Sequence, residues 1–246
     1  MMHIIGAFRA TRLFFHLLYG FALASIFPRL NQRLRRQILQ RWSCQLLCIL
    51  NVKLISESIN PFEQGIIVTN HVSWLDVFVL NTVMPMRFVA KSEVQQWPLF
   101  GWLCEQAQTL FIERGRARDA ARINKQLVRL LQEGESLVVF PEGTTTDGRK
   151  VGAFHASLLQ PAIDAQTPVH PVAIRYQDAH GRLSSAAAYI DEISFISSLW
   201  NILSCKSLHV RLIATTSIHA ADSDRRSVAN QAREQIHAAL LCMSGP

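Results

Sequence analysis

The chain has 246 residues, enough for one α/β domain with a full core but short for two. Hydrophobic residues make up 49 % and charged residues only 17 %, and both values lean toward those of membrane-associated proteins. The net charge of +7 belongs to the N-terminal quarter: residues 1–56 hold eight basic residues and no acidic one, and the rest holds 17 basic against 18 acidic residues. This distribution argues against a nucleic-acid-binding surface. A basic patch beside apolar helices favours attraction to anionic lipid, at about 1 kcal/mol per residue.

The five cysteines indicate neither a disulfide framework nor a zinc site, because their number is odd and no C-x-x-C pair occurs. Free thiols fit the reducing, cytosolic side of a membrane. Cys44 and Cys48 lie one helical turn apart, and we predict that both pack in the core.

The N-terminal segment contains the apolar run "LFFHLLYGFALASIF" (residues 13–27), which is interrupted by His16. A bilayer span needs about 20 apolar residues, so this run is short. The strongly basic stretch "PRLNQRLRRQILQRW" follows it, and no small-residue cleavage site intervenes. We predict that residues 5–50 form two helices that lie in one leaflet. Two alternatives stay open: a helical cap packed on the core, and one tilted span over about residues 4–27.

After residue 50 the pattern changes to short β-rich runs that alternate with helical stretches. The predicted strands are 51–56, 65–69, 87–90, 109–113, 136–140, 169–176, 186–190 and 207–216. The predicted helices are 73–84, 99–106, 117–133, 153–165 and a last one that begins after Ser223. Continuous apolar strands separated by helices indicate a largely parallel sheet covered on both faces. The predicted fold class is therefore α/β: a single domain with a mostly parallel mixed sheet flanked by helices (residues 51–246), plus an N-terminal membrane-associated helical pair (residues 1–50).

The first polar block is "TNHVSWLDVF" (residues 69–78), where His71 precedes Asp76 by five positions. Ser73 and Asp76 fit a capping box ahead of an apolar helix, which places Asp76 at the third helical position. One tight turn could then bring the carboxylate to the imidazole, fix its tautomer and stabilise the imidazolium. On this stretch alone, a helix start with an incidental histidine is an equal alternative. No G-x-S-x-G or H-E-x-x-H motif occurs, although Ser73 stays open as a nucleophile.

The second polar block is "LFIERGR" (residues 110–116). Its residues Glu113, Arg114, Gly115 and Arg116 follow a predicted strand directly and precede a helix. Guanidinium groups beside a glycine suit a phosphate, by paired hydrogen bonds and close backbone approach. A solvated turn is the alternative.

Two further blocks occur later in the chain. In "VVFPEGTTTDG" a buried strand stops at Pro141 and leads into Glu142, Gly143 and Thr144, a turn dense in donors and acceptors. In "VHPVAIRY" (residues 169–176) a proline interrupts a strand, which a bulged edge strand explains equally well.

These blocks resemble those of a known family. "NHVSWLD" is similar to the H-x4-D block of the glycerolipid acyltransferases, the group that contains 1-acylglycerol-3-phosphate acyltransferase. "FIERGR", "FPEGT" and "VHPVAI" resemble its second, third and fourth blocks in the expected order, over roughly residues 60–180. One departure is Thr145, where the phosphatidate-forming branch usually has an arginine. "FPEGTTTDG" is closer to members associated with lyso-ornithine lipid acylation, so the acceptor head group stays open.

The resemblance implies a membrane-bound O-acyltransferase that moves a fatty acyl group from a thioester to a lipid hydroxyl. His71 is expected to act as the general base and Asp76 to orient it, with acyl-CoA or acyl-carrier protein as donor. No metal, cofactor or covalent enzyme intermediate is required. The expected acceptor is 1-acylglycerol-3-phosphate, giving phosphatidic acid, and the alternative acceptor is lyso-ornithine lipid.

By the same resemblance, Arg114 and Gly115 hold the acceptor phosphate, and Glu113 of the same block binds substrate. The residues expected to shape the same pocket are Glu142, Gly143 and Thr144. Lys91, at the end of the predicted strand 87–90, is a second candidate for the phosphate.

Two other classes of function are weighed against this one. A lipid hydrolase would use the same histidine and aspartate to activate water. A non-catalytic module would only bind membranes through residues 1–50, and polar blocks at strand ends count against it. The expected partners are a membrane lipid and an anionic membrane surface, with no nucleic acid, and the expected location is the cytoplasmic face of the inner membrane.

Overall fold

The computed structural model describes residues 2–57, 64–112, 117–190, 193–220 and 223–243. Seven strands form one sheet. They are β1 (Val52–Glu57), β2 (Ile66–Thr69), β3 (Arg87–Lys91), β4 (Leu110–Ile112), β5 (Leu137–Val139), β6 (Val169–Gln177) and β7 (Leu208–Ala214). Their order is β1-β7-β6-β2-β5-β3-β4, and neighbours are parallel except β6 and β7. The predicted α/β class with a mostly parallel, mixed sheet is confirmed.

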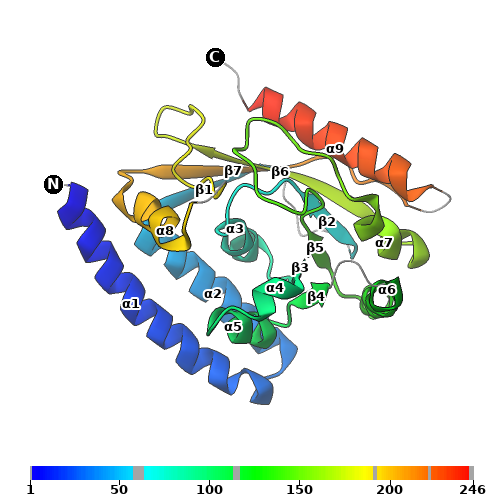
Figure 1. Ribbon diagram of the computed structural model, residues 1–246, viewed down its shortest axis with the longest axis horizontal. Coiled ribbons are helices and arrows are strands. Elements are labelled where there is room, and N and C mark those ends of the chain that lie inside the picture. Colours follow the sequence, from blue (N-terminus) through cyan, green and yellow to red (C-terminus); the bar gives the residue numbers. More distant parts are fainter. Residues whose placement is uncertain (1, 58–63, 113–116, 191–192, 221–222, 244–246) are drawn as a thin grey trace.

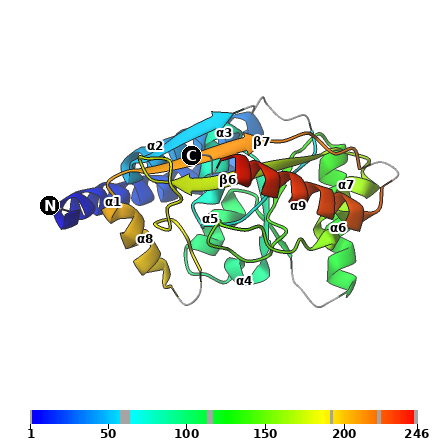
Figure 2. The same ribbon diagram turned by 90° about the horizontal axis from the view of Figure 1, so that it is seen from above.

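Helices cover both faces of this sheet (Figure 1). They are α1 (Met2–Ile26), α2 (Gln32–Leu50), α3 (Asp76–Val83), α4 (Ser92–Gln95), α5 (Phe100–Gln106), α6 (Ala117–Gln132), α7 (Gln160–Asp164), α8 (Phe195–Ser204) and α9 (Arg225–Cys242). One buried cluster joins the sheet to α2, α3 and α8, and a second joins it to α6, α7 and α9. Seen from above, α9 runs along the sheet beside β6 (Figure 2).

Strand β6 explains why the sheet sits between two cores. All nine of its residues are buried. Val172, Ile174 and Tyr176 belong to the cluster with α3, whereas Ala173 belongs to the cluster with α9. Side chains alternate between faces along a strand, so a continuous apolar run implies cover on both sides.

One predicted strand is wrong, and the ten-residue helix α8 was missed. Residues 186–190 form no strand, because the run is rich in alanine and its backbone bonds to a loop instead of a ladder: Tyr189 N–H donates to the carbonyl of Val72 at 3.0 Å. Helix α8 was not predicted, since its serines interrupt the apolar pattern. Ser194 caps it by accepting a hydrogen bond from Ser197 N–H.

The predicted N-terminal helical pair is present. The two helices are joined by His16, whose ring stacks on Trp42 with centroids 4.4 Å apart and whose Nε2 lies 3.1 Å from the Trp42 carbonyl. Gly20 permits this approach, because a Cβ there would lie 2.7 Å from the indole nitrogen of Trp42. Residues Ile5–Arg29 are long and apolar enough to cross a membrane, and large apolar side chains such as Phe15 face outward.

The prediction that Cys44 and Cys48 pack in the core is wrong, since both are exposed. Helix α2 is amphipathic, and its inward side carries Leu46, Leu47 and Leu50, which pack with α3. The cysteines occupy the opposite stripe of the same helix.

A buried carboxylate ties α2 to the sheet. Glu135 accepts hydrogen bonds from the side chains of Gln32, Arg36 (2.8 Å) and Arg87 (3.2 Å), and its side chain is 12 % exposed. Burial alone would raise the pKa of Glu135, but the hydrogen bond from Gln32 and the two guanidinium groups outweigh it and lower that pKa. The start of α2 is therefore held to the beginnings of β3 and β5.

We expect Glu135→Gln to lower the free energy of unfolding by about 1–2 kcal/mol at neutral pH, because two guanidinium groups lose their anion. A lowered pKa in the folded state adds stability above the unfolded value of 4.5, and this stability is lost as the pH falls through the folded value. The difference between variant and wild type should therefore shrink below about pH 4.5 in denaturant titrations. Glu133→Gln, which changes an exposed carboxylate nearby, should alter stability by less than about 0.5 kcal/mol.

Candidate active site

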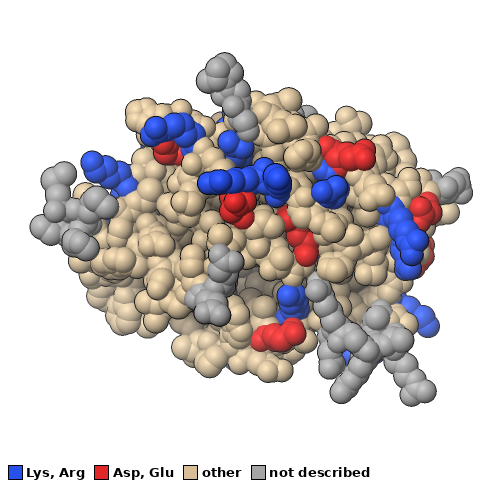
Figure 3. Space-filling model, turned by 45° about the horizontal axis from the view of Figure 1, so that its top comes forward, with Lys and Arg blue, Asp and Glu red and all other residues tan. Residues whose placement is uncertain are grey.

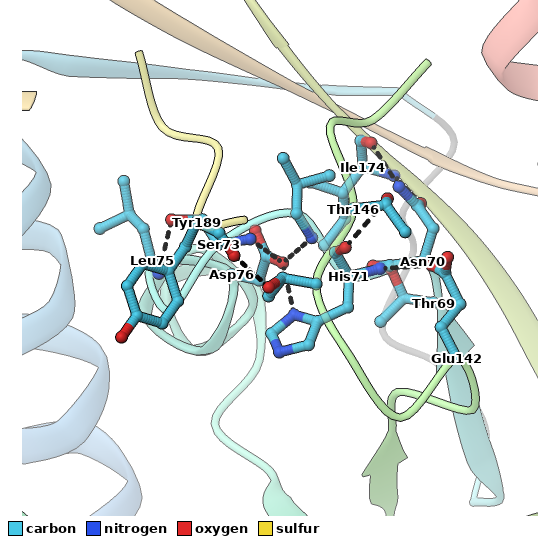
Figure 4. Close-up of polar contacts among 12 residues, drawn as sticks. Thr69, Asn70, His71, Ser73, Leu75, Asp76, Glu142, Thr146, Ile174 and Tyr189 are labelled. Atoms are coloured by element: carbon cyan, nitrogen blue, oxygen red, sulfur yellow. Dashed lines mark hydrogen bonds and ion pairs between the residues drawn. The ribbon is translucent and has the colours of Figure 1, made fainter. Parts of the chain in front are cut away.

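The loop after β2 is fixed to the sheet by Asn70. Its side-chain amide donates to the carbonyl of Ile174 at 3.0 Å, and its Oδ1 accepts from Ile174 N–H at 2.8 Å, so it continues the pairing with β6 as a strand residue would (Figure 4). Asn70 is buried and both bonds are satisfied. The loop therefore leaves the carboxyl end of a central strand in a defined direction, where α/β sheets place their sites.

His71 and Asp76 are in direct contact. His71 Nδ1 lies 2.8 Å from Asp76 Oδ2, and this oxygen also accepts from the N–H groups of Val72 (2.8 Å) and Ser73 (3.0 Å). Asp76 Oδ1 accepts from the hydroxyl of Tyr176 at 2.7 Å. Four donors thus satisfy a carboxylate that is completely buried. A carboxylate only accepts, so the proton of the neutral ring lies on Nδ1 and the free lone pair lies on Nε2.

Helix α3 begins later than the capping box predicted. Asp76 is the first helical residue and not the third. Its carboxylate reaches back to Ser73 N–H as in a capping box, but Ser73 Oγ accepts from Leu75 N–H at 3.2 Å. Ser73 is fully buried in this role, which removes it as a candidate nucleophile.

The ring of His71 remains accessible. Its side chain is 21 % exposed, one face stacks on Phe140 with centroids 4.0 Å apart, and Phe140 in turn stacks on Phe88. No residue in the described ranges forms a hydrogen bond with Nε2, which points away from Asp76 (Figure 4). The aromatic stack fixes the ring plane while the side chain of His71 stays partly exposed.

The third block supports the backbone of the first. Glu142 Oε1 accepts from His71 N–H at 2.8 Å, and its Oε2 accepts from Gly152 N–H at 2.8 Å. Burial raises the pKa of Glu142, although both N–H groups oppose this. Gly143 has φ +67°, which a residue with a side chain rarely adopts, and the turn leaves Thr144 exposed. Of this block, Thr144 is the member that faces solvent.

The two following threonines fasten the loop further. Thr146 donates to the carbonyl of His71 from its N–H (2.8 Å) and its hydroxyl (3.2 Å). The Thr145 hydroxyl donates to the carbonyl of Tyr189. The position expected to carry an arginine therefore holds a hydroxyl group bound to the backbone.

Of the second block, Glu113, Arg114 and Gly115 lie outside the described residues. The strand before them, β4, ends at Ile112, and the register of β3 pairs Lys91 with Ile112. Lys91 is exposed. It is the last residue of β3, so it lies at the carboxyl edge of the sheet, beside the residue that leads into this block.

Two residues of the site were missed by sequence reasoning: Tyr176 and Phe140. Tyr176 lies 100 positions from Asp76 and shares no motif spacing with it. Alternation along β6 does place it on the face of Val172 and Ile174, and a buried tyrosine hydroxyl needs a partner. Burial and the charge of Asp76 raise the pKa of Tyr176 well above its ordinary value, so the hydroxyl stays protonated as a donor.

Tyr176→Phe should lower kcat about tenfold with KM unchanged, because a carboxylate that lacks one donor holds the imidazole less firmly in place. The same carboxylate would carry more localised charge and favour the imidazolium. The acidic limb of the pH profile of kcat should therefore move to higher pH, which a merely structural loss would not cause. Tyr19→Phe removes a hydroxyl from the exposed side of α1 and should change neither quantity.

Comparisons with known proteins identify the family of this chain. The family model described as Acyltransferase matches residues 51–175. The chain is 38 % identical over 216 residues to the lyso-ornithine lipid O-acyltransferase of Pseudomonas aeruginosa, covering 86 % of this chain and 81 % of that protein. It is 38 % identical over 176 residues to the 1-acyl-sn-glycerol-3-phosphate acyltransferase of Neisseria meningitidis serogroup B, covering 71 % and 69 % of the two chains.

Among solved structures, the 1-acyl-sn-glycerophosphate acyltransferase PlsC of Thermotoga maritima has the same fold, with a TM-score of 0.65 at 18 % identity over 97 % of this chain and 98 % of that one. The family model runs from β1 into β6 and contains the first three polar blocks, and Tyr176 lies one residue beyond its end. This chain belongs to the acyltransferase family and is an acyltransferase.

Proposed function

We propose that the enzyme transfers a fatty acyl group from an acyl thioester, acyl-CoA or acyl-carrier protein, to the free hydroxyl of 1-acylglycerol-3-phosphate, giving phosphatidic acid. The observation that carries this proposal is the pair of His71 and Asp76: the 2.8 Å contact through Nδ1, the complete burial of the carboxylate and the open Nε2. Such a pair removes a proton from a hydroxyl group without a protein nucleophile.

In this mechanism Nε2 of His71 accepts the hydroxyl proton as the acceptor oxygen attacks the thioester carbonyl carbon. A C–O bond forms, and the carbonyl electrons move onto oxygen in a tetrahedral intermediate. Asp76 stabilises the imidazolium that results. The intermediate then collapses, the C–S bond breaks, and the leaving thiolate takes the proton from Nε2, which restores the neutral ring.

Cationic groups at the carboxyl edge of the sheet would hold the acceptor phosphate. We assign this role to Arg114 and Gly115, with Glu113 in the same block and Lys91 beside it. The pairing of Lys91 with Ile112 supports the assignment, because it brings the ammonium group to the edge where the block begins. The acceptor pocket would be shaped, on the other side of His71, by Glu142, Gly143 and Thr144.

A second candidate acceptor is lyso-ornithine lipid. It is favoured by Thr145, whose hydroxyl binds the carbonyl of Tyr189 at the position where a phosphate-binding arginine is expected. The Pseudomonas aeruginosa relative that carries this name also aligns over more of the chain than the Neisseria meningitidis relative.

We place the enzyme on the cytoplasmic face of the inner membrane, with residues 1–50 as the anchor and 51–246 as the catalytic domain. Both acceptors are lipids of a leaflet, so the site has to open at a membrane surface. The excess of basic residues before Glu57 supports attraction to anionic lipid.

The test measures thiol release by the purified full chain in detergent, with each acceptor side by side and a long-chain acyl thioester as donor. Release should rise with the concentration of one acceptor and saturate. Release that is independent of either acceptor would indicate a hydrolase instead. An absence of release with both, in a folded protein that binds vesicles, would leave only the membrane-binding module.

A further inference from the structure

A second group of exposed apolar side chains lies outside the N-terminal helices. It comprises the Trp97–Trp102 turn, which joins α4 to α5 and includes the first three residues of α5, and the outer side of α8. Leu99 is 69 % exposed between two exposed tryptophans, and Ile196 of α8 is 78 % exposed. The chain carries no charged residue from Trp97 to Cys104 or from Phe195 to Cys205. Exposed apolar patches of this kind mark sites of contact with a partner or a membrane.

The backbone of the turn holds Leu99 in an unfavourable conformation. Leu99 has φ +63° and ψ −43°, and Phe100 N–H donates to the carbonyl of Pro98 at 2.6 Å, which closes a three-residue γ-turn. This form of the turn is rare and strained for a residue with a side chain. The first turn of α5 needs glycine, because a Cβ on Gly101 would lie 2.0 Å from the carbonyl oxygen of Gln95. A glycine at 99 would suit this backbone better than leucine, so the fold alone does not account for the leucine.

This turn continues the exposed apolar side of α1. The ring of Trp102 stacks on Phe21 of α1 with centroids 6.1 Å apart. Arg9 of α1 donates to the carbonyls of Leu203 and Cys205, which fastens the end of α8 to the same helix. Helices α1, α8 and α5 lie on one side of the molecule (Figure 1), and that side shows few Lys, Arg, Asp or Glu side chains (Figure 3).

Aromatic contacts connect this surface to the loop of His71. Phe100 contacts Phe195 with centroids 6.0 Å apart, and Phe195 contacts Trp74 at 5.2 Å. Trp74 also donates from its indole nitrogen to Ser198 at 3.1 Å. Trp74 lies in the loop between the histidine and the aspartate, so α8 borders this loop directly, and the Trp97–Trp102 turn is connected to it through Phe195 of α8.

We infer that α1, α8 and the Trp97–Trp102 turn form one lipid-facing surface, and that Leu99 inserts into the same leaflet as α1. Tryptophan, proline and leucine without charged neighbours suit the boundary between head groups and acyl chains, where aromatic rings are enriched. The basic residues of the first 56 positions complement anionic head groups around this surface. The inference rests on the proposed function in one respect: an acceptor that is a membrane lipid must reach His71 from that leaflet.

The first experiment compares Leu99→Gln with Leu241→Gln in binding to vesicles of phosphatidylethanolamine and phosphatidylglycerol. Leu241 is also exposed, at 60 %, but it lies on α9, which packs against the opposite face of the sheet. Salt at about 0.5 M screens the basic residues and leaves the apolar contact to be measured. Leu99→Gln should weaken binding about tenfold, as expected for an inserted leucine, and Leu241→Gln should leave it unchanged.

A second variant separates insertion from misfolding. Leu99→Gly fits the positive φ, so its Tm should not fall below that of the wild type, while its vesicle binding should weaken like that of Leu99→Gln. Wild-type binding by both variants would overturn the inference. Sedimentation gives another decisive outcome: a wild-type dimer that Leu99→Gln converts to a monomer, with unchanged vesicle binding, would show that the surface binds a second copy of the chain.

Activity assays distinguish a failure of this inference from a failure of the proposed function. Leu99→Gln should lose activity on an acceptor embedded in vesicles and keep it on a short-chain acceptor dissolved in water. Equal losses on both would place Leu99 in the substrate pocket and contradict insertion. A wild type inactive on both acceptors would refute the proposed function, and the vesicle-binding comparison would still decide the insertion of Leu99.

Discussion

Replacing His71 by alanine is expected to lower kcat by about 10²- to 10⁴-fold, the range typical of a lost general base. KM for the acceptor should change little, because in the proposed mechanism the ring contacts the hydroxyl group and not the head group. The measurement is thiol release by purified His71→Ala at saturating donor, over a range of acceptor concentrations. The fold should survive, since the ring is partly exposed and Asp76 keeps its donors from Val72, Ser73 and Tyr176.

The matched control is His180→Ala. His180 is exposed in the turn after β6, far along the chain from His71 and Asp76, and its loss should leave kcat within about twofold. A folded His71→Ala enzyme with the wild-type rate would remove the proposed mechanism. A drop of the same size in the control would point to a general effect of the substitutions on the protein.

The parts of the site that are local in sequence were the predictable ones. Five positions between His71 and Asp76 allow one turn to close, and a serine and an aspartate around a helix start already restrict the geometry. The predicted start of α3 was two positions too early, because Ser73 Oγ accepts its hydrogen bond from Leu75 N–H. Several backbone N–H groups lie near this hydroxyl, and spacing alone does not decide which of them it binds. Tyr176 was missed because its contact with Asp76 depends on how β6 packs over α3, which no local pattern encodes.

The same distinction holds for the fold. Apolar runs predicted a sheet covered on both faces because each run must bury two sets of side chains. They did not reveal that β7 runs antiparallel to β6, since direction depends on the path of the chain through α8 and not on composition. Cys44 and Cys48 were misplaced for a related reason: a helix with one buried stripe can be turned either way until its partner, here α3, is known.

Asp76→Asn is expected to lower kcat by about 10²- to 10³-fold while the site keeps its shape. The amide oxygen can take the place of Oδ2, which accepts from Val72 and Ser73, and the amide nitrogen would then face the hydroxyl of Tyr176, which can rotate to accept. This orientation keeps the proton of His71 on Nδ1. The enzyme would therefore retain the lone pair on Nε2 and lose only the negative charge that stabilises the imidazolium.

That loss has a signature in the pH profile. Without the charge the imidazolium forms less readily, so the acidic limb of kcat should move to lower pH, opposite in direction to Tyr176→Phe. Asp164→Asn, an exposed aspartate on α7, should leave rate and profile unchanged. The opposite directions of the shifts in Asp76→Asn and Tyr176→Phe are the decisive result. If Asp76 only held the loop together, these two substitutions would lower the rate by misplacing His71, and neither would move the acidic limb. A limb that stays in place in both folded variants would show that the carboxylate orients His71 without stabilising its charge.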